Sequence, residues 1–224
     1  VWRSHIGVDL QNDVTRAAWD FLRQHLAPAH RYVFSRREYV PSWMDAALVA
    51  VITPSIDPFS PKNQELEAGE VRAILHTIGV LDGDGPFDQP GRFVRRDGET
   101  AVVRRAAVIT GESRPAAGDP VVLQVSRWDR LKDMPGVMRA FADHVVPSGP
   151  GYLMLVGPSV TDVADDPEGA AVYGECRLRW QGLPAAARER ILLVTLPLDD
   201  IDENAAMVNA LQRHARVVAQ KSLA

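Results

Sequence analysis

Residues 121–126 read Val-Val-Leu-Gln-Val-Ser, the first of four apolar runs that decide the fold. The other three, at 152–157, 191–196 and 217–220, are likewise continuous rather than alternating in hydrophobicity. Continuous runs are typical of parallel strands that are buried on both faces. We therefore predict one parallel, doubly wound α/β sheet from about residue 120 onward. The helices between its strands are predicted at 133–146, 167–180 and 203–214.

The first half of the sequence has shorter elements. The dipeptide Asp97-Gly98 between two apolar runs predicts a hairpin. The small, proline-bearing stretch 113–120 indicates a connection, so we place a domain boundary near residue 118. The predicted domains are 1–118, with the connector, and 119–224. Further strands are expected at 1–6, 32–35 and 46–52, and further helices at 15–26 and 67–78.

The composition restricts the class of protein. The chain has 224 residues, a formal net charge of −4 and an apolar fraction of 46%, as in ordinary globular proteins. It contains no 18-residue apolar stretch free of charge, which argues against a membrane span. Its mild acidity argues against a nucleic-acid partner. A single cysteine, Cys176, allows no internal disulfide and fits a reducing, cytoplasmic location.

The two ends of the sequence resemble the middle of a domain. The chain opens without methionine, directly in the strand-like stretch 1–6, and closes just after the strand predicted at 217–220. We therefore expect it to be an internal part of a longer protein, with both of its domains incomplete.

Two cations lie where an open α/β sheet binds its ligand, just after the carboxyl end of a strand. Arg127 and Lys132 follow the run at 121–126 and precede a helix that Asp133 is expected to cap. An arginine and a lysine at this position can bind a diphosphate. The alternative is two solvated cations paired with Asp129 and Asp133.

Other candidate residues carry weaker signals. Gly157, after the second strand, would let the backbone approach a ligand, or would serve a turn. Arg3 and His5 alternate on the first strand and so face one side. We expect no metal site, because Asp165-Asp166 lacks the spacing of a calcium loop. Cys176 lies within a predicted helix and is interpreted as a packing residue.

An ordered set of motifs along nearly the whole chain resembles retaining GT-B glycosyltransferases of the trehalose synthase type. The phosphate-binding stretch of that family is similar to Gln124-Val125-Ser126-Arg127-Trp128-Asp129 with Lys132-Asp133. The other matching segments are Val1-Trp2-Arg3-Ser4-His5-Ile6-Gly7, Asn12-Asp13, Trp19-Asp20-Phe21-Leu22, the stretches 34–41 and 54–63, Asp165-Asp166-Pro167-Glu168-Gly169, 208–213 and Gln220-Lys221-Ser222-Leu223.

The resemblance implies a GT-B fold of two Rossmann-like domains facing a cleft. It implies a retaining hexosyltransferase that moves glucose from a nucleotide sugar to glucose and forms trehalose. Arg127 and Lys132 would be catalytic through the leaving diphosphate or phosphate. His5, also catalytic, would lie near the reacting carbon, and Arg3 would contact substrate. Gly157 stays a candidate substrate contact on the ground of its position after the second strand. The family continues beyond the last residue of this chain with a glutamate-bearing segment, so we expect these 224 residues alone to be inactive.

Two other functions fit the same motifs. A retaining trehalose phosphorylase would use free phosphate in place of the nucleotide, and a non-catalytic module would only bind sugar. The expected ligands are UDP-glucose or ADP-glucose, glucose and trehalose, with no further cofactor. A homodimer is one assembly compatible with the sequence.

Overall fold

A computed structural model describes residues 1–4, 7, 12–83, 90–160 and 167–222. Its contacts divide the chain into two compact units, residues 1–57 and 58–224. The domain limits predicted from the sequence, 1–118 and 119–224, do not coincide with these units. The difference lies in residues 58–118, whose described part supplies one helix and three strands to the second unit.

The first unit is a three-stranded parallel sheet in the order β1-β2-β3. Its helix α1 begins at a capping box, in which the side chain of Asn12 accepts from the Thr15 N–H at 3.0 Å and Thr15 Oγ1 accepts from the Asn12 N–H at 2.8 Å. The apolar run predicted as a strand at 46–52 is a 3₁₀ turn followed by a short strand. The elements are β1 (Trp2–Arg3), α1 (Asp13–Leu26), β2 (Tyr32–Phe34), η1 (Arg37–Tyr39), η2 (Ala46–Leu48) and β3 (Val49–Val51).

The second unit is built on a five-stranded sheet in the order β10-β7-β8-β9-β6. The four strands predicted from the apolar runs are all parallel in it, which confirms that prediction. They are β7 (Val121–Val125), β8 (Tyr152–Pro158), β9 (Ile191–Leu196) and β10 (Val217–Val218). The fifth, β6 (Val108–Thr110), pairs antiparallel with β9 and was not predicted.

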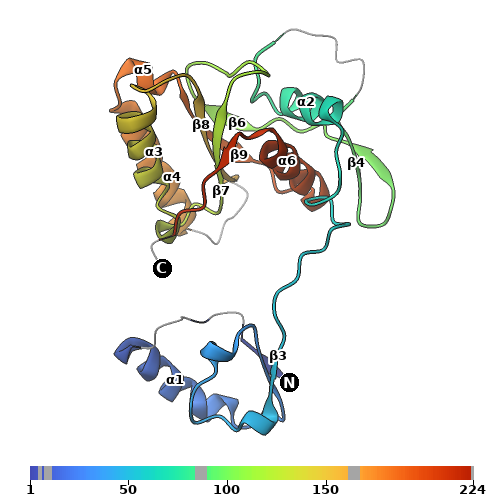
Figure 1. Ribbon diagram of the computed structural model, residues 1–224, viewed down its shortest axis with the longest axis vertical. Coiled ribbons are helices and arrows are strands. Elements are labelled where there is room, and N and C mark those ends of the chain that lie inside the picture. The colour runs from blue at the N-terminus through green and yellow to red at the C-terminus, as the bar shows by residue number, and fades with distance from the viewer. Residues whose placement is uncertain (5–6, 8–11, 84–89, 161–166, 223–224) are drawn as a thin grey trace. The chain divides into compact units, whose positions relative to one another are not determined.

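Helices cover both faces of this sheet, α3 and α4 on one and α2 and α6 on the other (Figure 1). Alternate residues of the strands pack into the two hydrophobic cores on opposite faces of the sheet. Leu153 and Leu155 pack with α3 and α4, whereas Met154 and Val156 pack with α2 and α6. This double coverage explains the continuous apolar runs. The helices are α2 (Ala68–Thr77), α3 (Met134–Ala140), α4 (Pro167–Gln181), α5 (Ala185–Arg188) and α6 (Ile201–His214).

The helix predicted at 133–146 is shorter than expected. Asp133 caps it, as predicted, but regular α3 ends at Ala140 and continues as the π-helical turn η4 (Phe141–Val145). The remaining elements are the 3₁₀ turn η3 (Arg130–Lys132) and the predicted hairpin, whose antiparallel strands are β4 (Arg92–Val94) and β5 (Thr100–Val102).

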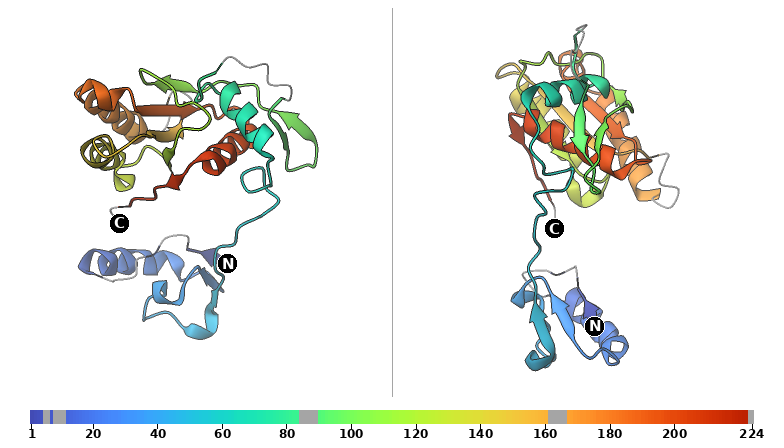
Figure 2. Two further views of the ribbon diagram at one scale, coloured as in Figure 1. Left: turned by 45° about the horizontal axis from the view of Figure 1, so that its top comes forward. Right: turned by 90° about the vertical axis from the view of Figure 1, so that its right-hand side faces the viewer.

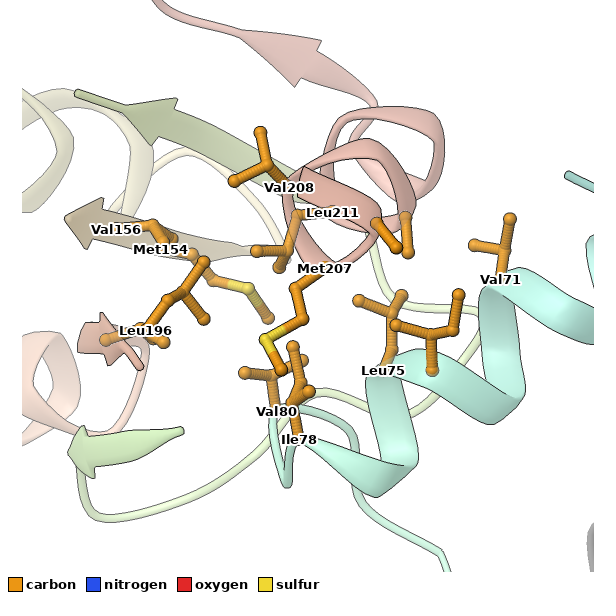
Figure 3. Packing of buried hydrophobic residues seen from close by; sticks show 14 of the residues in the cluster. Val71, Leu75, Ile78, Val80, Met154, Val156, Leu196, Met207, Val208 and Leu211 are labelled. Atoms are coloured by element: carbon orange, nitrogen blue, oxygen red, sulfur yellow. The ribbon is translucent and has the colours of Figure 1, made fainter. Parts of the chain in front are cut away.

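Helix α2 explains why residues 58–118 belong to the second unit. It packs against α6, beside which it lies in both views of Figure 2. Its side chains Val71 and Leu75 share a core with Met207 and Leu211 of α6 (Figure 3). Because α2 buries its apolar face here, the chain from residue 58 onward packs as one body.

Candidate functional site

The segment after β7 carries the two predicted cations on a tightly hydrogen-bonded loop. Asp129 caps the turn η3 by accepting from the Leu131 N–H at 2.8 Å. Its second carboxylate oxygen accepts from the Arg127 guanidinium at 3.4 Å. Arg127 remains 75% exposed, so a ligand can reach its guanidinium. The alternative pairing of Arg127 with Asp129 is therefore present, and it leaves most of the guanidinium donors available.

Lys132 closes the same turn and is half-buried. Its carbonyl accepts a hydrogen bond from Nε2 of Gln124, on the preceding strand, at 2.8 Å. Within the described ranges, no carboxylate forms an ion pair with the Lys132 ammonium. The alternative pairing of Lys132 with Asp133 is not present, because the Asp133 carboxylate contacts the Gly136 N–H and Lys221.

Asp133 links the loop to the next strand in the sheet. Its backbone is left-handed, with φ 42° and ψ 45°, a conformation that aspartate tolerates better than most residues. One carboxylate oxygen accepts from the Gly136 N–H at 3.1 Å and caps α3, and the other forms an ion pair with Lys221, just after β10. The Lys221 ammonium holds the pKa of Asp133 below its ordinary value.

Trp128 fixes the middle of the loop to the sheet. Its side chain is buried and its Nε1 donates to the Pro158 carbonyl at 2.9 Å. A Cβ placed on Gly157 would lie 2.4 Å from that Nε1, so the position requires glycine because the indole packs on it. The structure thus gives Gly157 a packing role, and its predicted contact with substrate stays a prediction.

A cavity of about 170 Å³ opens beside this loop at the carboxyl ends of β7, β8 and β9, where open α/β sheets bind ligands. This volume is smaller than a typical small-molecule site, so it suits one part of a ligand. Asn204, in the first turn of α6, lines it and donates to the Pro197 carbonyl at 2.8 Å. The other lining residues are Val125, Ser126, Arg127, Val156, Gly157, Pro158, Leu196, Leu198 and Val208.

The remaining predicted site residues belong to the first unit. Arg3 lies on β1 and is exposed to solvent. His5 lies outside the residues that the structure describes. The structure therefore brings Arg127, Lys132 and Gly157 to one edge of one sheet. The functional roles of these three residues, like those of Arg3 and His5, stay predictions.

Other chemistry is limited in the described parts of the chain. There, no group of three His, Cys, Asp or Glu side chains is arranged to hold a metal ion. Nor is any described helix long and apolar enough to cross a membrane. Cys176 is fully buried and its pKa is raised by burial to about 12, which confirms its interpretation as a packing residue.

Sequence reasoning missed two residues of this site, Gln124 and Lys221. Gln124 is a polar residue within an apolar strand, which is itself a signal of a specific hydrogen bond. Lys221 is one of three lysines in a chain whose other 22 basic residues are arginines. Both lie within the segments that carried the family resemblance, but no role had been assigned to them.

Comparison with known proteins supports that resemblance. The trehalose synthase of Pyrococcus horikoshii is 31% identical to this chain over 224 residues, which is all of the chain and 42% of that protein. The chain is thus similar over its whole length to a trehalose synthase. The trehalose synthases of Thermococcus litoralis and Rubrobacter xylanophilus are 30% and 28% identical over 223 residues, again with 42% of each covered. No family model matches the chain.

These matches confirm the resemblance and set its extent. The chain spans less than half the length of the curated proteins that it matches. The match is nevertheless continuous over the whole chain, from the first unit through β10. The loop that carries Arg127 and Lys132 therefore lies within the shared region.

Proposed function

We propose that the intact protein containing this chain is a retaining GT-B glycosyltransferase that transfers glucose from UDP-glucose or ADP-glucose to glucose and forms trehalose. The observation that carries the proposal is the position of Arg127 and Lys132. Both follow β7 at the carboxyl edge of a parallel sheet, in a chain related along its whole length to trehalose synthases. Diphosphates bind at this edge in open α/β sheets.

The proposed reaction exchanges one bond at the anomeric carbon of the donor. The bond from that carbon to the diphosphate oxygen breaks as the acceptor hydroxyl oxygen bonds to the same face. The acceptor proton passes to the leaving diphosphate, which balances the charge that develops there. Retention of configuration then needs no protein nucleophile.

The protein contributes position and positive charge to this step. The exposed guanidinium of Arg127 can donate two parallel hydrogen bonds to phosphate oxygens, and the Lys132 ammonium adds a point charge. The caps, anchors and strand contacts that hold the loop make these cations pre-organised for the developing charge. His5 and Arg3 are further residues proposed to contact the donor sugar.

Initial rates of trehalose formation by the intact protein, with glucose and either nucleotide sugar, test the proposal. Lys132→Ala should lower kcat/KM by at least tenfold, because a charge-assisted hydrogen bond contributes about 1.5–3 kcal/mol. Arg127→Lys should also lower it, because the fork geometry is lost. Arg72→Ala, which removes an exposed cation on α2, is the control and should leave the rate unchanged.

Other outcomes distinguish the alternatives. Release of glucose 1-phosphate from trehalose and inorganic phosphate, with no nucleotide dependence, would identify a phosphorylase. Binding of trehalose without turnover of either kind would identify a sugar-binding module. Wild-type rates from both site variants would show that the two cations do not contact the donor.

A further inference from the structure

Gln124 is the least expected side chain in the core of the second unit. It lies in β7, is 1% exposed, and pairs in register with Leu155 of β8, which is fully buried. Val122, two residues earlier on the same face of the strand, packs into the core under α3 and α4. An apolar side chain would therefore fit the surroundings of residue 124.

The hydrogen bonding of Gln124 is one-sided. Its Nε2 donates to the Lys132 carbonyl at 2.8 Å, across eight residues of chain. Its Oε1 is buried and accepts no hydrogen bond from any residue that the structure describes. A buried acceptor without a donor destabilises the folded state, so a side chain selected only for stability at this position would be apolar.

The hydrogen bond from Gln124 to the Lys132 carbonyl holds the backbone of the predicted phosphate-binding residue. The loop is anchored before Lys132 by Trp128 and after it by Asp133, with Lys221. Between these anchors, Gln124 is the side chain that reaches the Lys132 backbone from inside the sheet. The polar residue thus joins a rigid strand to the residue whose ammonium must be held in place.

We infer that Gln124 is a positioning residue: its amide fixes the backbone of Lys132 so that the ammonium meets the diphosphate of the donor. The inference rests on the proposed function, because it assigns Lys132 to a diphosphate. Gln124 itself does not touch substrate, and its cost in stability is offset by the pre-organisation of the cation.

The test is a double-mutant cycle on diphosphate binding by the intact protein. UDP and ADP are titrated calorimetrically into the wild type, Gln124→Met, Lys132→Ala and the double variant, and each protein's melting temperature is recorded. Methionine keeps the approximate length and volume of glutamine but cannot donate. Thr195→Val is the matched control, since it removes a buried hydroxyl from β9 in the same sheet.

We expect Gln124→Met to weaken diphosphate binding about tenfold while the melting temperature stays within about 3 °C of the wild type. In the Lys132→Ala background the same change should have no further effect, because its target is gone. Thr195→Val should bind as the wild type does. An equal loss in both backgrounds, or no loss in either, would overturn the inference and leave the proposed function standing.

A second variant keeps the test decisive if Gln124→Met does not fold. In Gln124→Glu, a protonated carboxyl can still donate a hydrogen bond to the Lys132 carbonyl, whereas an ionised carboxylate would repel that carbonyl oxygen. Burial favours the protonated form. The ratio of its dissociation constant to that of the wild type should therefore rise between pH 5 and 8. A constant ratio would contradict the inference, and a wild type that binds neither nucleotide would overturn both proposals.

Discussion

The two units each contain a sheet built on parallel strands, to which the second unit adds the antiparallel strand β6, and strands of the two sheets differ in how they are covered. In the second unit, every residue of β9 is buried and the neighbouring β8 is buried except at its ends. In the first unit, β3 is partly or fully exposed along its length and β1 has one exposed residue of two. The second sheet can therefore hold a loop through buried anchors such as Trp128 and Gln124, whereas Arg3 lies on a strand without such support.

The largest expected effect tests this difference in coverage. Leu193→Ala in β9 removes a fully buried side chain and should lower the free energy of unfolding by about 2–5 kcal/mol. Val51→Ala in β3, where the side chain is already 37% exposed, should cost less than about 1 kcal/mol. Urea denaturation of the intact protein, followed by circular dichroism, measures both. Equal costs would show that the two sheets are covered alike.

A smaller effect is expected where the loop meets the sheet. Gly157→Ala places a Cβ 2.4 Å from the Trp128 indole and should destabilise the second unit by about 1–3 kcal/mol. The indole should also move, with a shift in its fluorescence. Gly174→Ala in α4 is the control, because open space surrounds that position and alanine should stabilise the helix there. If Gly157→Ala were as stable as the wild type, the tight contact with Trp128 would be wrong.

The smallest effect concerns an ion pair between the hairpin and α6. Arg95 donates two hydrogen bonds to Asp200, which holds the pKa of Asp200 at about 2, below its ordinary 3.8. A carboxyl whose pKa is lower in the folded than in the unfolded protein stabilises the fold at pH values above its unfolded pKa. This stabilisation is lost as the pH falls from about 5 to 2. Asp200→Asn should lower the free energy of unfolding at pH 7 by on the order of 1–2 kcal/mol and flatten its acid dependence.

Urea denaturation of the wild type and of Asp200→Asn at pH 7, 4 and 3 measures that dependence. The gap between the two proteins should be widest at pH 7 and should narrow at pH 3. Asp97→Asn, in the exposed turn of the hairpin, should behave as the wild type does. A gap that stayed constant with pH would contradict the assignment of the effect to the Asp200 carboxylate.

The sequence predicted the parts of the fold that depend on local patterns. Continuous apolar runs identified β7 to β10, and turn chemistry identified the hairpin. It did not predict β6, because a three-residue edge strand has no distinctive pattern and its pairing with β9 is distant in sequence. The limits of the compact units likewise depend on contacts that are distant in sequence, namely the packing of α2 against α6.

The candidate site likewise has features that the local sequence predicts and features that depend on contacts between distant residues. Arg127 and Lys132 could be proposed from the sequence because their position after a strand is a local feature. The contact of Trp128 with Gly157 joins neighbouring strands, and the ion pair of Asp133 with Lys221 spans 88 residues, so neither could be read from the chain. Gln124 was visible as a polar residue among apolar ones, but its partner was not.

The central claim is that Arg127 and Lys132 bind the diphosphate of a nucleotide-sugar donor. Calorimetric titration of UDP-glucose and ADP-glucose into the intact wild type and into Lys132→Ala and Arg127→Lys tests it directly. We predict that the wild type binds one of the two donors and that each variant binds it at least tenfold more weakly at equal thermal stability. Unchanged affinity in both variants would contradict the claim and place the donor away from the loop after β7.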